Sequence, residues 1–69
     1  MSYLPEAGEI WELRRWKSEE AGFQTEGHFL LLRPGPLGMG AFQMLDLDTG
    51  ELTVKGMARG TYSFWSRVA

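Results

Sequence analysis

Basic and aromatic residues alternate near the N-terminal end of the chain. The run from 11 to 17 contains Trp11, Arg14, Arg15, Trp16 and Lys17. Aromatic rings can stack on nucleic-acid bases while Arg binds phosphate. Arg and Trp are also among the residues that dominate the binding energy of protein interfaces. The run therefore indicates a binding surface, either for a nucleic acid or for a protein.

Carboxylates surround this run and help to choose between the two kinds of partner. Glu9 and Glu12 lie before or within it, and Glu19 and Glu20 follow it. These groups repel phosphate, and the formal net charge of the chain is only -2. We therefore predict a non-enzymatic module that binds another protein or a second copy of itself. The alternative is a small barrel that binds nucleic acid.

A second aromatic candidate lies near the C-terminal end. In the segment 61–67, strand alternation places Tyr62 and Phe64 on one side and Trp65 on the other. If Tyr62 and Phe64 fill the core, Trp65 faces outward, where a large aromatic side chain is costly unless a neighbour or partner covers it. The predicted binding residues are Arg15, Trp16, Trp65, Arg14 and Arg67.

Three acidic residues gather in the stretch 46–51, which loosely resembles a calcium-binding loop. Asp46, Asp48 and Glu51 supply carboxylates on one short bend. However, Gly50 comes one position too early for such a loop, and the distal Glu that completes it has no counterpart. We interpret the stretch as a solvated turn and predict no metal site.

Neither the single histidine nor the glycine-rich stretch completes a catalytic or cofactor-binding arrangement. His28 has Glu26 near it in sequence, but this spacing along a strand does not form a catalytic pair. Gly35, Gly38 and Gly40 follow a predicted strand in the order G-x-x-G-x-G. A dinucleotide site needs G-x-G-x-x-G before a helix. We therefore predict neither enzyme activity nor a cofactor.

The clearest structural signal is a hairpin over residues 45–54. Leu45 and Leu47 alternate with polar residues before the turn, and Leu52 and Val54 alternate with them after it. Between them, Asp48-Thr49-Gly50 has the composition of a tight turn, because Asp accepts backbone N–H bonds and Gly adopts positive φ. The hairpin predicts that the fold is mainly β.

The remaining elements follow from short apolar runs and from the Gly and Pro residues that bound them. A shift of apolar parity after Phe42 and Met44 indicates a bulge near Met44. The segment 9–21 has a second interpretation, a helix packed on a four-stranded meander, because Ile10, Leu13 and Trp16 share a helical stripe. The preferred strands are 9–16, 28–33, 41–47, 51–55 and 61–67, with loops at 17–27, 34–40 and 56–60.

The order of these elements resembles that of SH3-like barrels, with a long loop after the first strand, a central meander and a short last strand. The resemblance covers residues 8–68 and implies a small five-stranded barrel whose first and last strands lie close together. The opening Gly8-Glu9-Ile10-Trp11-Glu12 is also similar to the first strand of PemK/MazF-type toxins, which share that barrel. Those toxins are larger, and the chain has no set of residues that matches their catalytic set.

Size and composition agree with one small domain over residues 1–69. Hydrophobic residues make up 43% of the chain, which is too many for a disordered protein. The chain has no cysteine, which excludes disulfides and thiolate metal sites and fits the cytoplasm. We expect no secretory signal at the N-terminus and no membrane span, because the longest apolar run, from Phe29 to Leu32, is far too short.

Overall fold

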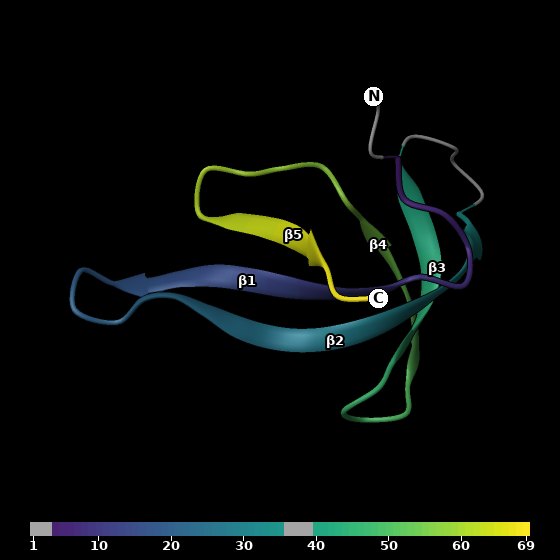
Figure 1. Ribbon diagram of the computed structural model, residues 1–69, viewed down its shortest axis with the longest axis horizontal. Coiled ribbons are helices and arrows are strands. Elements are labelled where there is room, and N and C mark those ends of the chain that lie inside the picture. Colours follow the sequence, from purple (N-terminus) through teal and green to yellow (C-terminus); the bar gives the residue numbers. More distant parts are fainter. Residues whose placement is uncertain (1–3, 36–39) are drawn as a thin grey trace.

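The fold is an all-β sheet of five strands, seen in a computed structural model that describes residues 4–35 and 40–69. Figure 1 shows the strands in sequence colours. Residues 1–3 of the N-terminal segment and residues 36–39 of the predicted loop 34–40 lie outside the described residues. The strands are β1 (Ile10–Ser18), β2 (Gly22–Pro34), β3 (Ala41–Asp46), β4 (Leu52–Gly56) and β5 (Ser63–Arg67).

The strand order across the sheet is β4-β3-β2-β1-β5, and every neighbouring pair is antiparallel. The prediction of a mainly β fold is therefore confirmed, and so is the prediction that the first and last strands lie together. The helical interpretation of 9–21 is wrong, because Ile10–Ser18 is a strand paired on both sides. Among the described residues β4 and β5 are not paired, so the sheet is open rather than closed into a barrel.

The predicted long loop over 17–27 is mostly strand. Only residues 19–21 form a turn, and β2 already begins at Gly22, which has a φ of 67°. The hydroxyl of Ser18 accepts a hydrogen bond from the backbone N–H of Ala21 at 3.0 Å and caps this turn. Polar residues over 17–27 had indicated a loop, but they belong instead to the exposed ends of two long paired strands.

The core is small and lies on one face of the sheet, which we call the inner face. Five side chains of the described residues are buried there: Leu13, Phe29, Leu31, Phe42 and Met44. They come from β1, β2 and β3, and Trp11, Met57 and Trp65 pack against them. The spacing of two along each strand is the expected period for side chains that share one face.

Strand β2 contains two bulges, and at each of them the side chains that had pointed to one face of the sheet begin to point to the other. Leu13 pairs with Gly27 but Arg14 pairs with Thr25, so Glu26 is an extra residue in β2. Further along, Leu31 pairs with Met44 and Arg33 pairs with Gln43, so Leu32 is a second extra residue. Each extra residue moves the rest of the strand to the opposite face. In Figure 1, β2 curves so that β3 and β4 cross β1 and β5 at a steep angle.

The position of the second bulge corrects the bulge predicted near Met44. The irregularity lies at Leu32, on the strand opposite, while the pairing of β3 with β4 is regular. Phe42 and Met44 are the buried residues of β3, and the residues of the other parity face outward. As a result Leu47, Leu52 and Val54 are 45%, 64% and 52% exposed.

The predicted turn between β3 and β4 is confirmed, although a different aspartate holds it. The carboxylate of Asp46 accepts the backbone N–H groups of Asp48 at 2.9 Å and Thr49 at 3.2 Å. Gly50 has a φ of 78°, as the turn requires, and its N–H donates to the carbonyl of Asp46 at 2.7 Å. The carboxylate of Asp48 instead accepts the backbone N–H of His28 at 3.1 Å and joins the turn to β2.

Glu9 connects the segment before β1 to the C-terminal end of the chain. Its carboxylate accepts the backbone N–H of Glu6 at 2.8 Å and the indole N–H of Trp11 at 3.0 Å, and Arg67 lies 3.2 Å away. The hydrogen bond from Glu6 lowers the pKa of Glu9 most, followed by that from Trp11, and the charge of Arg67 lowers it further. The charged form of Glu9 therefore favours the folded state.

Residues 4–35 and 40–69 include no helix of the length and apolar character needed to cross a membrane.

We expect Gly50→Val to lower the free energy of unfolding by about 1–3 kcal/mol, because a β-branched residue is strained at positive φ. Gly56→Val is a matched control, since Gly56 also has open space around its missing Cβ but lacks a positive φ. Chemical denaturation of both variants measures the difference. Equal stability of the two variants would contradict the conformational role of Gly50.

We expect Glu9→Gln to lower the melting temperature at neutral pH. Because the folded-state pKa of Glu9 is lowered, its contribution is complete above the unfolded pKa of about 4.3 and is lost as the pH falls through the folded pKa. The gap between wild type and variant in thermal unfolding should therefore close below about pH 4. Glu20→Gln removes the same charge from the exposed β1–β2 turn and serves as the control. A difference in melting temperature that stays constant from neutral pH to below about pH 4 would contradict the role of the Glu9 charge in stability.

Candidate functional site

Three aromatic side chains from three strands meet on the outer face of the sheet. Trp16 in β1 pairs with Phe23 in β2, and their ring centroids are 5.4 Å apart. Phe64 in β5 lies 5.0 Å from Phe23. Both contacts are edge-to-face, the arrangement that aromatic rings favour. We call Trp16, Phe23 and Phe64 the aromatic cluster.

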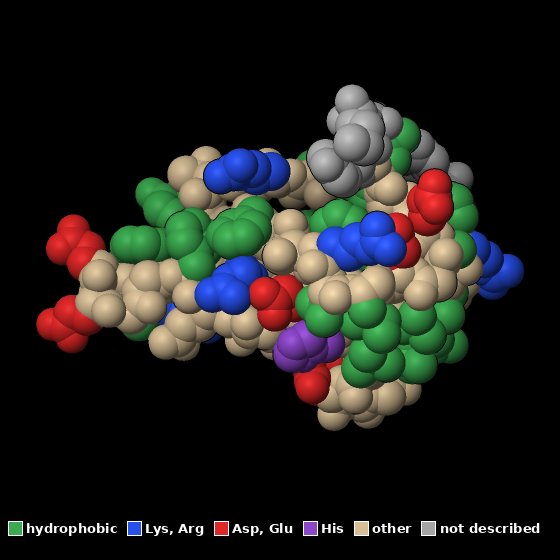
Figure 2. All heavy atoms as spheres, viewed as in Figure 1, with side chains coloured by type: hydrophobic (Ala, Val, Ile, Leu, Met, Phe, Trp, Pro, Cys, Tyr) green, Lys and Arg blue, Asp and Glu red, His purple; other side chains and the backbone are tan. Residues whose placement is uncertain are grey.

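The cluster is accessible although its members contact one another. Trp16 is 37% exposed and Phe23 is 36% exposed. Figure 2 shows this face, where hydrophobic side chains gather at the left end of the molecule, over the region of β1 and β5 in Figure 1. Mutual ring contacts limit the rotamers of each side chain, so the surface is ordered before any partner arrives.

The bulge at Glu26 places Phe23 in this cluster. Without the extra residue, Phe23 would share the inner face with Phe29 and Leu31, which have the same odd spacing in the chain. With it, Phe23 lies opposite Trp16 on the outer face. One inserted residue thus converts a potential core phenylalanine into a surface residue.

Two arginines flank the aromatic cluster. Arg14 donates to the carboxylate of Glu12 at 3.0 Å and to the backbone carbonyl of Phe23 at 3.2 Å, so its guanidinium is held beside the rings. On the other side, the guanidinium carbon of Arg59 lies 5.9 Å from the centroid of Phe64, within the range of a cation–π contact. The cluster therefore combines apolar rings with cations whose positions are defined.

A polar network continues from the cluster along the outer face. Glu12 accepts hydrogen bonds from Arg14 and from the hydroxyl of Thr25, the latter at 3.3 Å. The Nε2 atom of His28 lies 3.6 Å from Glu12, and its Nδ1 atom lies 3.6 Å from Asp48. Figure 2 shows the single histidine between acidic side chains. Arg14 and Thr25 thus hold Glu12 in place on the surface of β1, and the hydrogen bond from the backbone of His28 to Asp48 joins the turn after β3 to β2.

The structure brings together two of the five residues predicted to bind. Arg14 and Trp16 both lie on the outer face, and Trp16 belongs to the aromatic cluster. Arg15 points to the opposite face of β1, where it forms an ion pair with Glu26. Arg67 lies opposite Trp11 and pairs with Glu9. The five residues predicted to bind therefore do not form one patch.

The predicted orientation of the last strand is wrong. Trp65 pairs with buried Leu13, packs against the core and lies 5.3 Å from the ring of Phe29 in an edge-to-face contact. Phe64 lies on the outer face, and Tyr62 is 66% exposed. Alternation separates the two sides of a strand but does not say which side faces the core, because that depends on the register with β1.

Sequence reasoning missed Phe23, Phe64 and Arg59 as members of this surface. Phe64 was assigned to the core, and Phe23 lies in the segment predicted as a loop. A signal existed for Phe64, since the alternative parity of 61–67 exposes it. No local signal marks Phe23, because the bulge at Glu26 is visible only in the pairing of β1 with β2.

Among residues 4–35 and 40–69, no group of three or more His, Cys, Asp or Glu side chains is placed to hold a metal ion. Comparisons with models of protein families, with curated proteins and with solved structures found no match to this chain.

We expect Trp65→Ala to lower the free energy of unfolding by about 2–4 kcal/mol, because the truncation leaves a cavity beside Phe29 and Leu13. The matched change Trp16→Ala removes the same side chain from the outer face, and we expect a loss of about 1 kcal/mol from its ring contact. Urea denaturation compares the two. A larger loss for Trp16→Ala would contradict the assignment of faces.

Proposed function

We propose that this chain is a small SH3-like module that binds another protein through the aromatic cluster and catalyses no reaction. The observation that carries the proposal is the edge-to-face contact of Trp16, Phe23 and Phe64 on the outer face, with the first two more than one-third exposed. Rigid aromatic side chains are the residues that most often dominate protein interfaces. The pairing of β1 with β5 supports the SH3-like resemblance.

The charges around the cluster favour a protein over a nucleic acid. Arg14, which is held beside the cluster, is paired with the carboxylate of Glu12, and Arg59 lies over the ring of Phe64. Binding to a phosphate backbone depends on cations that are available to replace counterions. A protein partner with an apolar residue at the centre of its surface suits the exposed rings better. The lack of cysteine agrees with a reducing compartment such as the cytoplasm.

We expect peptides selected against wild-type protein from a random library to bind through the cluster. In a titration, Phe23→Ser should weaken their binding at least about tenfold, as loss of a hot-spot aromatic does. Thr53→Ser on β4 is a control away from the cluster. Circular dichroism and thermal unfolding of each variant separate loss of binding from loss of folding. Selected peptides that bind both variants as tightly as wild type would contradict the proposal.

The salt dependence of binding distinguishes a nucleic-acid partner from a protein partner. A single-stranded oligonucleotide should show weak binding that disappears as salt is raised, whereas the selected peptides should bind with little salt dependence. Tight oligonucleotide binding that Phe23→Ser abolishes would replace the protein-binding proposal. Sedimentation of the free protein over a range of concentrations shows whether the cluster also binds a second copy, and Phe23→Ser should then reduce that association.

A further inference from the structure

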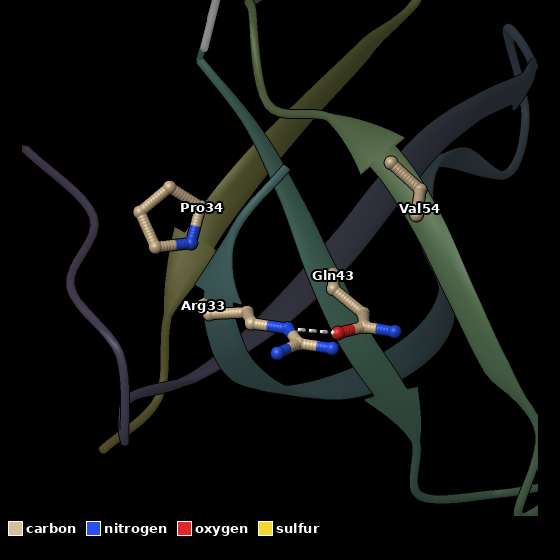
Figure 3. Close-up of a pocket in the computed structure, with 4 residues that line it drawn as sticks. All are labelled: Arg33, Pro34, Gln43 and Val54. Atoms are coloured by element: carbon tan, nitrogen blue, oxygen red, sulfur yellow. Dashed lines mark hydrogen bonds between the residues drawn. The ribbon is translucent and has the colours of Figure 1, made fainter. Parts of the chain in front are cut away.

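A row of three side chains crosses the outer face at the far end of β2 from the aromatic cluster. Arg33 in β2 pairs with Gln43 in β3, and Gln43 pairs with Val54 in β4. Together with Pro34 these residues line an open hollow of about 440 Å³. Figure 3 shows the four side chains, with Arg33 extending toward Gln43. The bulge at Leu32 creates this row, because it moves Arg33 to the outer face.

One hydrogen bond orients the guanidinium of Arg33, and its other donors have no acceptor among the residues that the structure describes. Its Nε donates to the Oε1 atom of Gln43 at 2.5 Å (Figure 3). Because a guanidinium is planar and carries five N–H donors, this bond defines the plane of the group and leaves its two terminal nitrogens for another acceptor. Two terminal nitrogens in one plane match the two oxygens of a carboxylate.

Arg33 also carries a charge that the chain does not neutralise within the described residues. Three other arginines, Arg14, Arg15 and Arg67, each have a carboxylate within ion-pair distance. Arg33 has only the neutral amide of Gln43 in residues 4–35 and 40–69. The sequence of the two segments outside these ranges, 1–3 and 36–39, contains no Asp or Glu. An external carboxylate would supply the missing charge.

The other walls of the hollow are apolar, so a ligand should carry an apolar group next to its carboxylate. Val54 is 52% exposed and Pro34 contributes a ring. Val54 lies in β4, an edge strand that pairs only with β3 among the described residues. An extended chain can therefore approach the hollow from this edge of the sheet.

We propose that this hollow binds a carboxylate attached to a branched aliphatic group, as presented by a polypeptide that ends in Leu, Val or Ile. The terminal carboxylate forms two hydrogen bonds with Arg33, and the last side chain lies against Val54 and Pro34. A chain end brings both groups within one residue, whereas an acidic side chain presents a carboxylate without a branched apolar group. The proposal does not depend on the aromatic cluster, since Phe23 and Arg33 lie near opposite ends of β2.

The test is an NMR titration of wild-type protein with N-acetyl-leucine, N-acetyl-leucinamide and acetate. We expect N-acetyl-leucine to shift the Arg33 Nε–H and Val54 methyl signals, with weak affinity on the order of millimolar for so small a ligand at an open site. The amide lacks the charge and acetate lacks the aliphatic group, so each should bind at least about tenfold more weakly. Because these comparisons use wild-type protein, they do not depend on the folding of any variant.

Variants then assign the site. Arg33→Gln should reduce the affinity for N-acetyl-leucine at least about tenfold, and Arg33→Lys should reduce it less because the charge remains while the paired donors are lost. Lys17→Gln removes one positive charge from the exposed end of β1 and should leave the affinity unchanged. Equal binding of acid and amide, or an equal effect of Lys17→Gln and Arg33→Gln, would overturn the proposal.

A final comparison separates a chain end from a free small acid or an acidic side chain. A tripeptide ending in a free Leu should bind more tightly than isovalerate, because its backbone adds contacts along β4. An N-acetyl-glutamate whose main-chain carboxyl is amidated should bind no better than acetate. Tighter binding of isovalerate than of the tripeptide would overturn the assignment to a polypeptide end, and so would preferred binding of the glutamate side chain.

Discussion

The two bulges of β2 determine which side chains of this strand face the core and which face solvent. Side chains alternate between the two faces of a strand, so one extra residue transfers everything beyond it to the opposite face. Because of the bulges at Glu26 and Leu32, Phe29 and Leu31 in the central part of β2 face the core, whereas Phe23 and Arg33 near its two ends face outward. Without them, Phe23 would extend the inner face and Arg33 would bring a charge beside the core, where an unpaired charge is strongly unfavourable.

Because the core is small, aromatic contacts on both faces of the sheet contribute to its packing. Only five side chains of residues 4–35 and 40–69 are buried, and a chain of 69 residues buries little apolar surface in total. Trp65 adds to the core through its contact with Phe29, while Phe64, its neighbour in the chain, joins the aromatic cluster outside. Consecutive residues of the last strand thus belong to the core and to the proposed binding surface, which lie on opposite faces of the sheet.

The polar network keeps the two candidate surfaces apart. Glu12, His28 and Asp48 lie on the outer face between the aromatic cluster and the exposed aliphatic residues of β4 and of the turn before it. This row of charged and polar groups interrupts what would otherwise be one large apolar surface, and large continuous apolar surfaces promote nonspecific association. The same groups bind the turn after β3 to β2, because Asp48 accepts the backbone N–H of His28.

Local chemistry in the sequence was sufficient to predict the number of strands, the turn at Gly50 and the outward position of Trp16, since these depend on periodicity and on residues adjacent in the chain. It did not predict the start of β2, which begins at Gly22 within the predicted loop. The tertiary structure alone decided which side of the last strand meets the core, because only the pairing of Leu13 with Trp65 defines it. It also decided the positions of Phe23 and Arg33. A bulge arises from the register between two strands, so no residue read by itself reveals it.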